Sequence, residues 1–494
     1  MKEVNMNKET YQYFHYHEVP QSLIKLLSNR SAQSPYRQKF HIESEFGYLN
    51  DPNGFSYFNG KYHLFYQWSP LKYAEENIWY QGWHHLISND LVNWQSLGPG
   101  IEPDSIYESH GVYSGSSLDL GDELLVFYTG NTRDENWQRK PYQIIAKMDK
   151  NNQIKKELPP AIQGQPKGYT DHFRDPKLWI KDGKFYAIVG VQRENKTGAA
   201  LVLVSDNVSD WQIVGEIETG LDSFGYMWEC PDYFEIEDVA ILVFSPQGIA
   251  HEGEKYRNIY QTGYIVGRPI SQEKLNFNET AQFVELDRGF DFYAPQSSQL
   301  PDGRRVLFGW MGLPEINYPT EKYGYCGCLS VPREITYRND RICQYPVDEL
   351  TALRDELMVV DNNNICSISM QSDMELLIEK ANISNWKLMI GFDTHFKENL
   401  IIRFDQLKNQ LYLDRSMLKQ SIAPEYGTQR CIYENLDEIV SLRILLDTSS
   451  IEIFINQGVS SASARFFTDS KQRFIQFDSQ LQKLSGKIWS MRGE

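Results

Sequence analysis

The chain has 494 residues, too many for one ordinary hydrophobic core, so we expect two domains. Hydrophobic residues make up 41% of the chain and aromatic residues 13%, which favours a folded, β-rich protein with flat surfaces for sugar rings. The formal net charge of −17 argues against nucleic acid and anionic membrane surfaces as partners. A local basic pocket for a phosphorylated small molecule is still compatible with that charge.

The N-terminal residues and the cysteines indicate the compartment. Residues 1–9 include acidic side chains and no apolar core, so they are not typical of a signal peptide. No apolar run approaches membrane-spanning length. The six cysteines form no Cys-x-x-Cys pair, so we expect neither a disulfide framework nor a zinc site. These features predict a cytoplasmic protein with reduced thiols, and nothing in the sequence indicates its oligomeric state.

Residues 1–39 are polar apart from a short helical pattern at 21–27, and we expect them to pack as a lead-in segment on the body. From residue 40 onward, five segments repeat one pattern, in which a turn with Pro, Gly or Ser leads into a tight β-hairpin. The repeats open at 51, 114, 175, 229 and 293, and are therefore 54 to 64 residues apart. Four hairpin turns contain glycine beside Asn or Asp, a strong hairpin signal, and the fourth repeat has Glu237-Asp238 instead.

Repeats of this size, each a small antiparallel sheet, predict an all-β fold with a five-bladed β-propeller at 40–338. Two stacked β-sandwiches are the alternative, but they would not explain a period of about 60 residues. After residue 345 the chain has short strands with loose alternation, which favours a second, C-terminal β-sandwich domain. We expect a connector with a turn or two of helix at 339–358 and the β-sandwich at 359–494.

Three of the five repeat openings carry an acid, namely Asp51, Asp175 and Glu229. The first strand of each propeller blade lines the central channel, so these side chains should converge. Like charges at short range do not all ionise easily, and we expect at least one raised pKa among them. Glycoside hydrolysis requires such a set, with one carboxylate to attack and one carboxylic acid to protonate the leaving oxygen.

Each acid has another interpretation. Asp51 could be no more than a residue of the Asp-Pro-Asn-Gly turn, and Asp175 could form a structural ion pair with Arg174. Asp232 stands three residues after Glu229, and the repeat pattern alone does not choose between them. The channel could also hold a calcium ion, although the chain has no Asp-x-Asp-x-Asp-Gly loop to support one.

Four motifs in order resemble the β-fructofuranosidases of glycoside hydrolase family 32: Asn-Asp-Pro-Asn-Gly at 50–54, Tyr-Ser-Gly-Ser at 113–116, Arg-Asp-Pro at 174–176 and Glu-Cys-Pro at 229–231. The resemblance extends from about residue 35 to the end and includes the stretch at 449–456. It implies a five-bladed propeller followed by a β-sandwich. One such motif would be a weak signal, whereas four at the spacing of the repeats are a strong one.

The resemblance also implies roles. Asp51 would be the nucleophile, Glu229, favoured over Asp232, would be the acid/base, and Asp175 would bind fructosyl hydroxyls and stabilise the transition state. No metal ion or organic cofactor is needed. The remaining expected substrate-binding positions are Asn50, Gln67, Trp83, Tyr113, Ser114, Arg174, Tyr293 and Trp310, of which Trp310 could instead be an ordinary packing residue.

The chain departs from the family pattern in four places. It has Tyr48-Leu49 where Trp-Met is common, and Trp83-His84-His85 where Trp-Gly-His is usual. Residues 72–76 lack a customary tryptophan, and Tyr113 replaces a phenylalanine. None of these changes touches the three acids. They concern the wall that receives the leaving sugar, and therefore the choice of substrate.

The resemblance implies a retaining hydrolase that releases fructose from a β-fructofuranosyl glycoside. An enzyme of this kind without an export signal would meet sucrose as sucrose 6-phosphate, giving glucose 6-phosphate and fructose. The alternatives are an invertase acting on free sucrose or short fructo-oligosaccharides, a fructosyl transferase and, more distantly, a non-catalytic carbohydrate-binding propeller. The sequence shows no phosphate-binding motif, and the basic candidates in early loops are Lys72, His84, His85 and Arg133.

Overall fold

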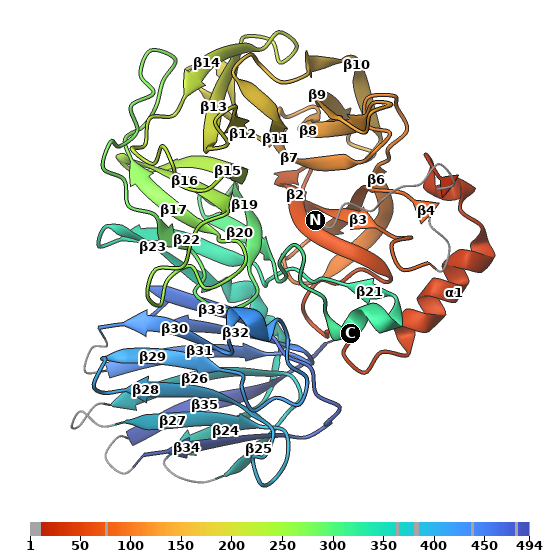
Figure 1. Ribbon diagram of the computed structural model, residues 1–494. Helices are drawn as coiled ribbons and strands as arrows, with labels where there is room; N and C mark the ends of the chain where they lie inside the picture. Colours follow the sequence, from red (N-terminus) through yellow and green to blue (C-terminus); the bar gives the residue numbers. More distant parts are fainter. Residues whose placement is uncertain are drawn as a thin grey trace.

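The computed structural model describes residues 11–74, 78–361, 365–379, 385–435, 439–479 and 483–493. These residues are mostly β-structure, as predicted. A ring of small sheets, coloured red to green in Figure 1, lies above two larger sheets in cyan and blue. Within the described residues, no helix has the length and apolarity needed to cross a membrane. None of the six cysteines, all of which lie in the described residues, forms a disulfide bond.

Five sheets of four or five strands make up the ring in the described residues. The first contains β2 (Gly47–Phe58), β3 (Lys61–Ser69), β5 (Gly82–Ser88) and β6 (Trp94–Ile101), with β21 (Tyr325–Cys326) at its edge. The second contains β7 (Val112–Asp119), β8 (Leu124–Arg133), β9 (Arg139–Met148) and β10 (Ile154–Gln163), and the third β11 (Tyr169–Lys181), β12 (Lys184–Arg193), β13 (Gly198–Ser205) and β14 (Gln212–Glu216). The fourth contains β15 (Met227–Ile236), β16 (Val239–Gln247), β17 (Gly263–Gly267) and β18 (Val284–Glu285), and the fifth β19 (Tyr293–Gln299), β20 (Arg305–Trp310), β22 (Arg333–Arg338) and β23 (Arg341–Pro346).

The hairpin turns form where their sequence predicts them. Asn59 and Gly60 have φ angles of 48° and 80°, and Asp182 and Gly183 have 51° and 73°. Two consecutive positive φ angles define the turn that matches the twist of paired strands, and Asn, Asp and Gly tolerate them best. These turns join the first and second strands of their sheets.

Apolar cores fill the spaces between neighbouring sheets. Phe127 of the second sheet and Val189 of the third belong to one such core. Phe55 and Phe308 close the ring between the first and fifth sheets, with their ring centroids 5.0 Å apart. The first strands contact one another in the cyclic order β2, β7, β11, β15, β19 and back to β2. The five repeat openings therefore surround a common axis.

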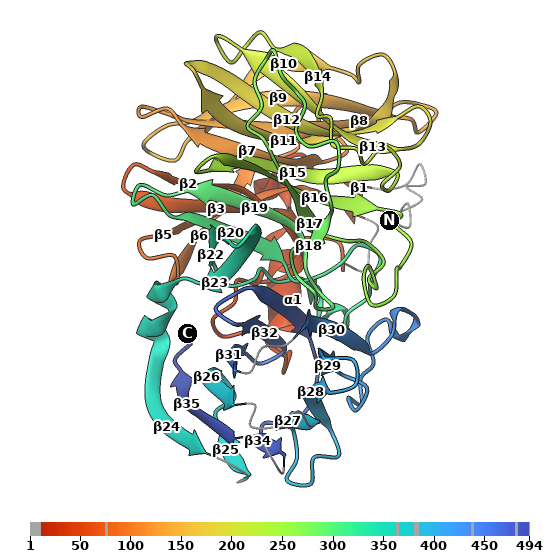
Figure 2. The same ribbon diagram turned by 90° about the vertical axis from the view of Figure 1, so that its left-hand side faces the viewer.

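In the part of the chain that the structure describes, two six-stranded sheets form the lower part of the molecule, and Figure 2 shows them facing each other beneath the ring. One contains β24 (Arg354–Asp361), β26 (Ser372–Glu379), β31 (Ile439–Leu446), β32 (Ser450–Ile455), β33 (Ser460–Arg465) and β35 (Lys483–Met491). The other contains β25 (Cys366–Ile368), β27 (Trp386–Gly391), β28 (Asn399–Asp405), β29 (Gln410–Asp414), β30 (Gln429–Glu434) and β34 (Arg473–Asp478). Met374, Leu376 and Ile378 alternate along β26 and enter the core between the sheets, whereas Leu377 is 36% exposed.

The boundary between the ring and the two larger sheets differs from the expected one. We expected the ring to end at 338, but β23 pairs with β22 and extends the fifth sheet to Pro346. The turn between them consists of Asn339 and Asp340, both at positive φ, and lacks the glycine that marked four of the five repeat hairpins. The connector is accordingly shorter than 339–358. Its short helix, η3 (Asp348–Leu353), leads directly into β24.

The lead-in segment packs on the body, as expected. The helical pattern at 21–27 lies in α1 (Gln21–Ala32), which buries Leu27. Arg30 donates hydrogen bonds to the carbonyl of Lys322 (3.0 Å) and to the carbonyl of Tyr73 (3.2 Å). The remaining short elements are β1 (Tyr11–Gln12), η1 (Tyr16–Glu18), β4 (Ile78–Trp79), η2 (Pro319–Tyr323) and η4 (Pro424–Tyr426).

A buried ionic network joins the chain just after the lead-in segment, the fifth sheet of the ring and one of the two larger sheets. The His41 ring lies 2.9 Å from Asp447 Oδ2 and 2.8 Å from Glu452 Oε1, with all three side chains fully buried. Arg333 of β22 also donates to Glu452 and lies 3.1 Å from Asp287. Burial alone would lower the pKa of His41, but the hydrogen bonds to the two carboxylates outweigh it and raise this pKa to about 9.

Replacing His41 by alanine should lower the free energy of unfolding by about 3–5 kcal/mol, because Asp447 loses its cation and Glu452 keeps only Arg333. The pKa is raised above the unfolded value of 6.5. The contribution is therefore complete below about pH 6.5 and is lost as pH rises through about 9. Thermal unfolding at about pH 6 and about pH 10 measures this. The fall in Tm between the two should be smaller in His41→Ala than in the wild type or in a variant at the exposed His395, and an equal fall in all three would contradict the role of His41.

Candidate active site

The first strand of every sheet in the ring is irregular at the same point. The register shifts fall between Leu49 and Pro52, Val112 and Gly115, Arg174 and Lys177, Glu229 and Asp232, and Tyr293 and Gln296. Bulges of this kind re-aim side chains. Residues from all five irregular segments line one small void of about 10 Å³ at the centre of the ring. The structure thus brings the repeat openings together around the axis.

Three residues at these bulges have strained backbones. Asp175, Cys230 and Ala294 have φ angles of 67°, 46° and 46°, which cost non-glycine residues about 1–3 kcal/mol each. A neighbouring side chain fixes each backbone N–H. Asp175 donates to Thr129 Oγ1 (3.0 Å), Cys230 to Asp175 Oδ2 (3.1 Å) and Ala294 to Ser245 Oγ (3.2 Å). Strain of this kind is held in place by its surroundings and is typical of functional sites.

Asp51 lies on β2 among three donors. Ser114 Oγ donates to its Oδ2 (2.6 Å), Asn50 Nδ2 to its Oδ1 (3.2 Å), and Cys230 Sγ lies 3.7 Å from Oδ2. Burial, together with the nearby charge of Glu229, raises the pKa of Asp51 to about 6, although the Ser114 hydrogen bond lowers it. Both oxygens of this carboxylate are therefore oriented by the protein, as a nucleophile requires.

Glu229 lies on β15 and is held by a different set of partners. Arg174 Nη2 donates to its Oε1 (2.6 Å), while Gln247 Nε2 (2.8 Å) and the Tyr293 hydroxyl (2.6 Å) donate to its Oε2. Arg174 and Tyr293 come from the third and fifth sheets, so Glu229 is fixed from both sides. Burial raises the pKa of Tyr293 well above its usual range, with Glu229 as the next cause, so its hydroxyl stays a proton donor.

Asp175 is buried beside the other two acids. Burial raises its pKa to about 7, and the charges of Glu229 and Asp51 add to this, while Arg174 opposes it. Asp51 and Asp175 thus both have the raised pKa that was expected among these acids. Arg174 Nε is 3.8 Å from Asp175, but the shorter contact of this arginine is with Glu229. The structure does not favour a simple structural pair of Arg174 with Asp175.

Asp232, the alternative to Glu229, makes different contacts. Its Oδ1 lies 3.3 Å from Lys177 Nζ, and its Oδ2 accepts the backbone N–H of Ser297 (2.6 Å). The side chain is 2% exposed. Asp232 therefore serves the packing of the first strands, whereas Glu229 contacts side chains of the third and fifth sheets.

Gln67 and Trp83 support their neighbours. Gln67 accepts a hydrogen bond from Asn50 and donates to the Val112 carbonyl (3.2 Å). Trp83 was expected to contact substrate, but it is fully buried, and its indole N–H donates to the Tyr113 carbonyl (3.1 Å). The reason is its place in the middle strand β5, whose burial is continuous. Trp83 thus positions the segment that carries Tyr113.

Trp310 shows the packing that was one of the two interpretations considered for it. It is 2% exposed and packs edge-on against Tyr48 (5.9 Å between ring centroids) and Tyr293 (6.4 Å). Its indole nitrogen is buried with no hydrogen-bond partner among the described residues. Packing is thus part of its role, beside the residue that holds Glu229.

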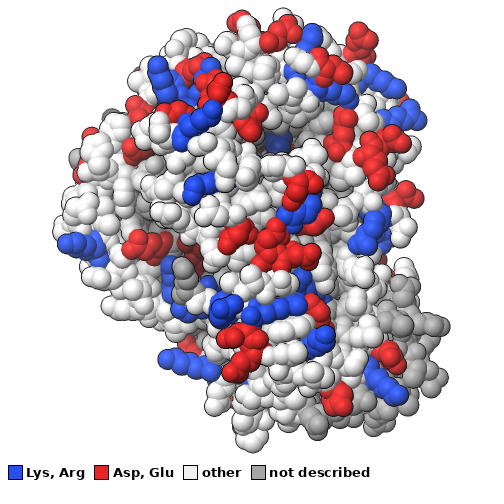
Figure 3. All heavy atoms as spheres, turned by 180° about the vertical axis from the view of Figure 1, so that it is seen from behind, with Lys and Arg blue, Asp and Glu red and all other residues white. Residues whose placement is uncertain are grey.

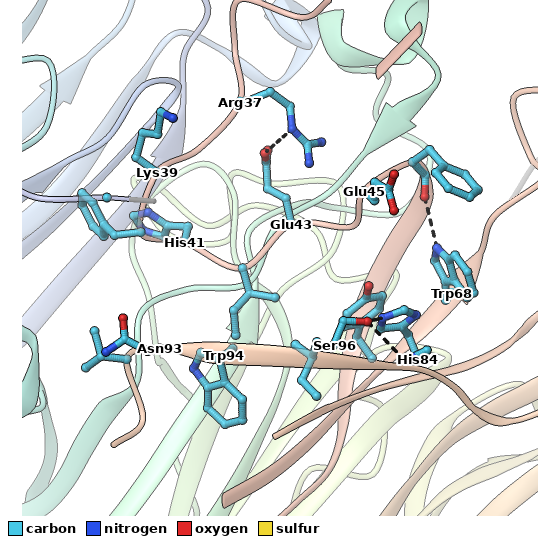
Figure 4. Close-up of a pocket in the computed structure, with 18 of the residues that line it drawn as sticks. Arg37, Lys39, His41, Glu43, Glu45, Trp68, His84, Asn93, Trp94 and Ser96 are labelled. Carbon is cyan, nitrogen blue, oxygen red and sulfur yellow. Dashed lines mark hydrogen bonds and ion pairs between the residues drawn. The ribbon is translucent and has the colours of Figure 1, made fainter. Parts of the chain in front are cut away.

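Three of the basic residues considered for a phosphate contact other side chains of the protein. Lys72 Nζ lies over the Tyr48 ring, 3.4 Å from its centroid, and His85 stacks on Phe65 at 4.1 Å. His84 bonds to Ser96 (2.7 Å) and lines a cavity of about 810 Å³ between the first sheet, the lead-in segment and the C-terminal end (Figure 4). None of the three acids lines that cavity. Burial lowers the pKa of His84 to about 4 and that of His85 to about 3, so both rings are neutral.

The motifs did not reveal four residues that matter here: Cys230, Gln247, Thr129 and His172. Cys230 lies inside the Glu-Cys-Pro motif at 229–231, but the glutamate and the proline are the residues by which this motif was noticed. Gln247 and Thr129 lie on the second strands of their sheets, opposite the reactive segments. His172 stands two residues before Arg174 and accepts a hydrogen bond from it (2.8 Å). The period-2 alternation along β11, which puts both side chains on one face, is the signal that could have identified His172.

Comparison with known proteins identifies the family. The model of the glycosyl hydrolases family 32 N-terminal domain matches residues 41–346, and that of the family 32 C terminal matches residues 349–490. Sucrose-6-phosphate hydrolase of Staphylococcus xylosus is 42% identical over 463 residues, which cover 92% of this chain and 92% of that protein.

Solved structures agree with this. Sucrose-6-phosphate hydrolase of Lactobacillus gasseri is 37% identical, with a TM-score of 0.91 and coverage of 97% of this chain and 98% of that one. A family 32 β-fructofuranosidase of Bombyx mori is 29% identical, with a TM-score of 0.84 and coverage of 97% and 99%. The chain, which carries the three acids on the first strands β2, β11 and β15, therefore belongs to glycosyl hydrolases family 32 and is a glycoside hydrolase.

Proposed function

We propose that this enzyme hydrolyses sucrose 6-phosphate to glucose 6-phosphate and fructose, with retention of configuration. The observation that carries the proposal is the group of three carboxylates, of which Asp175 is buried, while Asp51 and Glu229 are partly exposed and held by separate sets of donors. The relatives from Staphylococcus xylosus and Lactobacillus gasseri, both named sucrose-6-phosphate hydrolases, support the choice of substrate. Location in the cytoplasm stays a prediction.

The same proposal extends to the architecture. The five sheets are the blades of one five-bladed propeller that ends at Pro346, and the two larger sheets are a β-sandwich domain that begins at Arg354. The cyclic contacts of the first strands and the cores between neighbouring sheets support this division. The propeller carries the carboxylates, and the sandwich contributes the buried network around His41.

In the first step, Asp51 attacks the anomeric carbon of the fructosyl group and forms an ester bond to it. The bond from that carbon to the glycosidic oxygen breaks, and Glu229 gives its proton to this oxygen, so the glucosyl portion leaves as an alcohol. Ser114 and Asn50 orient the attacking carboxylate. Asp175 accepts hydrogen bonds from fructosyl hydroxyls as positive charge develops on the ring.

In the second step, Glu229, now a carboxylate, takes a proton from a water molecule as that water attacks the anomeric carbon. The ester bond to Asp51 breaks and fructose is released, which restores both groups. Arg174, Gln247 and Tyr293 hold the carboxylate form between the two steps. Two displacements at one carbon give net retention.

The pH dependence should report the raised pKa of Asp51. The carboxylate attacks only when it is ionised, so kcat/KM should fall as pH drops through about 6. In Ser114→Ala the hydrogen bond that lowers this pKa is lost, and the acidic limb should move to higher pH. A pH profile of kcat/KM for both enzymes measures this. An acidic limb near the ordinary aspartate value of 3.8, or no movement in the variant, would contradict the assignment.

A comparison of kcat/KM for sucrose 6-phosphate and for sucrose tests the proposed substrate. Two charge-assisted contacts to the phosphate would give a preference of about 10²–10⁴-fold for the phosphorylated sugar. Equal values would make the enzyme an invertase. Binding of either sugar with no release of fructose would instead favour the non-catalytic alternative.

A further inference from the structure

A group of basic side chains surrounds His172 beside the contact of Arg174 with Glu229. His172 Nδ1 lies 2.8 Å from Arg174 Nη1 and 3.4 Å from Arg139 Nη1. An arginine can only donate, so Nδ1 accepts and the ring proton lies on Nε2. Burial lowers the pKa of His172 to about 2, and the charges of nearby cations lower it further. The imidazole is therefore a neutral ring with one N–H donor left to offer.

The cations around His172 come from the second and third sheets. Arg174 and His172 lie on β11 of the third sheet. The others are Arg133 at the end of β8, Arg139 at the start of β9 and Lys196 in the turn between β12 and β13. Basic side chains of the second and third sheets thus lie together on the side of Glu229 that Arg174 contacts.

Arg133, Arg139 and Lys196 differ from Arg174, which forms an ion pair with Glu229. In the described parts of the chain, neither Arg133, Arg139 nor Lys196 forms an ion pair with a carboxylate, and the Nε of Arg139 is buried with no hydrogen-bond partner. Arg133 donates to the Trp137 carbonyl (3.0 Å). The nearest acid in sequence, Asp134, accepts the backbone N–H groups of its own turn. A buried donor of a cation left unpaired is costly, which indicates that an anion completes the group.

We propose that Arg133, Arg139 and His172 bind the 6-phosphate of the leaving glucose, an inference that rests on the proposed function. A phosphate monoester carries nearly two negative charges at neutral pH, and guanidinium groups match its oxygens in bidentate fashion. The Nε2–H of His172 adds a neutral donor. Arg174 contacts both His172 and Glu229. A glucosyl ring that lay between Glu229 and the two arginines would therefore place its glycosidic oxygen at Glu229 and its phosphate at Arg133 and Arg139.

To attract a phosphate, the positive charge of these side chains has to outweigh the net charge of the whole chain, which is −17. On the face shown in Figure 3, Lys and Arg are interspersed with Asp and Glu and form no broad basic area. Attraction of a dianion therefore depends on a small group of cations, and added salt screens the exposed members. The preference for the phosphorylated sugar should shrink as the salt concentration rises.

The experiment compares Arg139→Gln, Arg133→Gln and the double variant with the wild type. The readout is the ratio of kcat/KM for sucrose 6-phosphate to kcat/KM for sucrose, which cancels any loss of folded enzyme. The ratio should fall about 10- to 100-fold for each arginine that contacts the phosphate. Lys155→Gln removes one exposed positive charge from β10 of the same sheet and should leave the ratio unchanged. Product inhibition by glucose 6-phosphate, with glucose as the reference, should weaken in parallel.

The outcomes separate the inference from the proposed function. A wild type that prefers sucrose 6-phosphate, with the preference lost in the double variant and kept in Lys155→Gln, supports the site. A preference that survives in the double variant overturns the site and leaves the proposed function intact. A wild type with equal kcat/KM for both sugars overturns both.

Discussion

Replacing Asp51 by asparagine should lower kcat by about 10⁴–10⁶-fold for every leaving group, because no other group in the site can form the ester. The amide is close in size to the carboxylate and keeps the contacts with Ser114 and Cys230. Because the pKa of Asp51 is raised to about 6, its ionised carboxylate destabilises the folded protein at neutral pH. The uncharged amide removes this cost, so the variant should unfold at a Tm equal to or above that of the wild type. Steady-state kinetics and thermal unfolding measure both effects.

The matched control is Asp182→Asn. Asp182 occupies the hairpin turn of the third sheet at a φ of 51°, where asparagine fits equally well. It should keep full activity. If Asp51→Asn behaved in the same way, Asp51 would be a turn residue and the mechanism would be wrong.

Glu229→Gln should show a loss that depends on the leaving group. For sucrose 6-phosphate the loss in kcat should be about 10²–10⁴-fold, because the glycosidic oxygen departs without a proton. A fructosyl donor with a good leaving group, such as β-fructosyl fluoride, needs no such proton for the first step, so its first turnover should be nearly as fast as in the wild type. Single-turnover kinetics with the two substrates measure the difference.

An equal loss for both substrates in Glu229→Gln would instead assign Glu229 a positioning role. Gln247→Ala provides the comparison, because Gln247 donates to Glu229 without being an acid itself. Its effect should be smaller and independent of the leaving group.

Much of the architecture could be predicted because local turn chemistry and spacing determine it. Asn59-Gly60 and Asp182-Gly183 require positive φ angles that few residues tolerate, so these pairs mark hairpins by themselves. The regular spacing of Asp51, Asp175 and Glu229 is enough to predict that they occupy corresponding points of their sheets. The turn at Asn339-Asp340 has no glycine, and the last strand of the fifth sheet was missed for that reason.

The parts of the site that escaped prediction depend on contacts between segments distant in sequence. Gln247 reaches Glu229 from a second strand, and Arg139 reaches His172 from the start of β9 in another sheet. No motif records such pairs, because they arise from how neighbouring sheets are placed around the axis. Trp83 was predicted to contact the sugar, and this prediction did not account for its place in the sheet. The residue lies in a middle strand, where its side chain is fully buried.

Trapping the covalent intermediate tests the central claim most directly. Glu229→Gln incubated with β-fructosyl fluoride should accumulate fructosyl-enzyme, because the first step needs no acid and the second lacks its base. After acid quench and proteolysis, mass spectrometry should find one fructosyl group on the peptide that contains Asp51, and none on it in the Asp51→Asn/Glu229→Gln double variant. A label on another residue, or turnover of the fluoride with no labelled peptide at any time, would contradict the account.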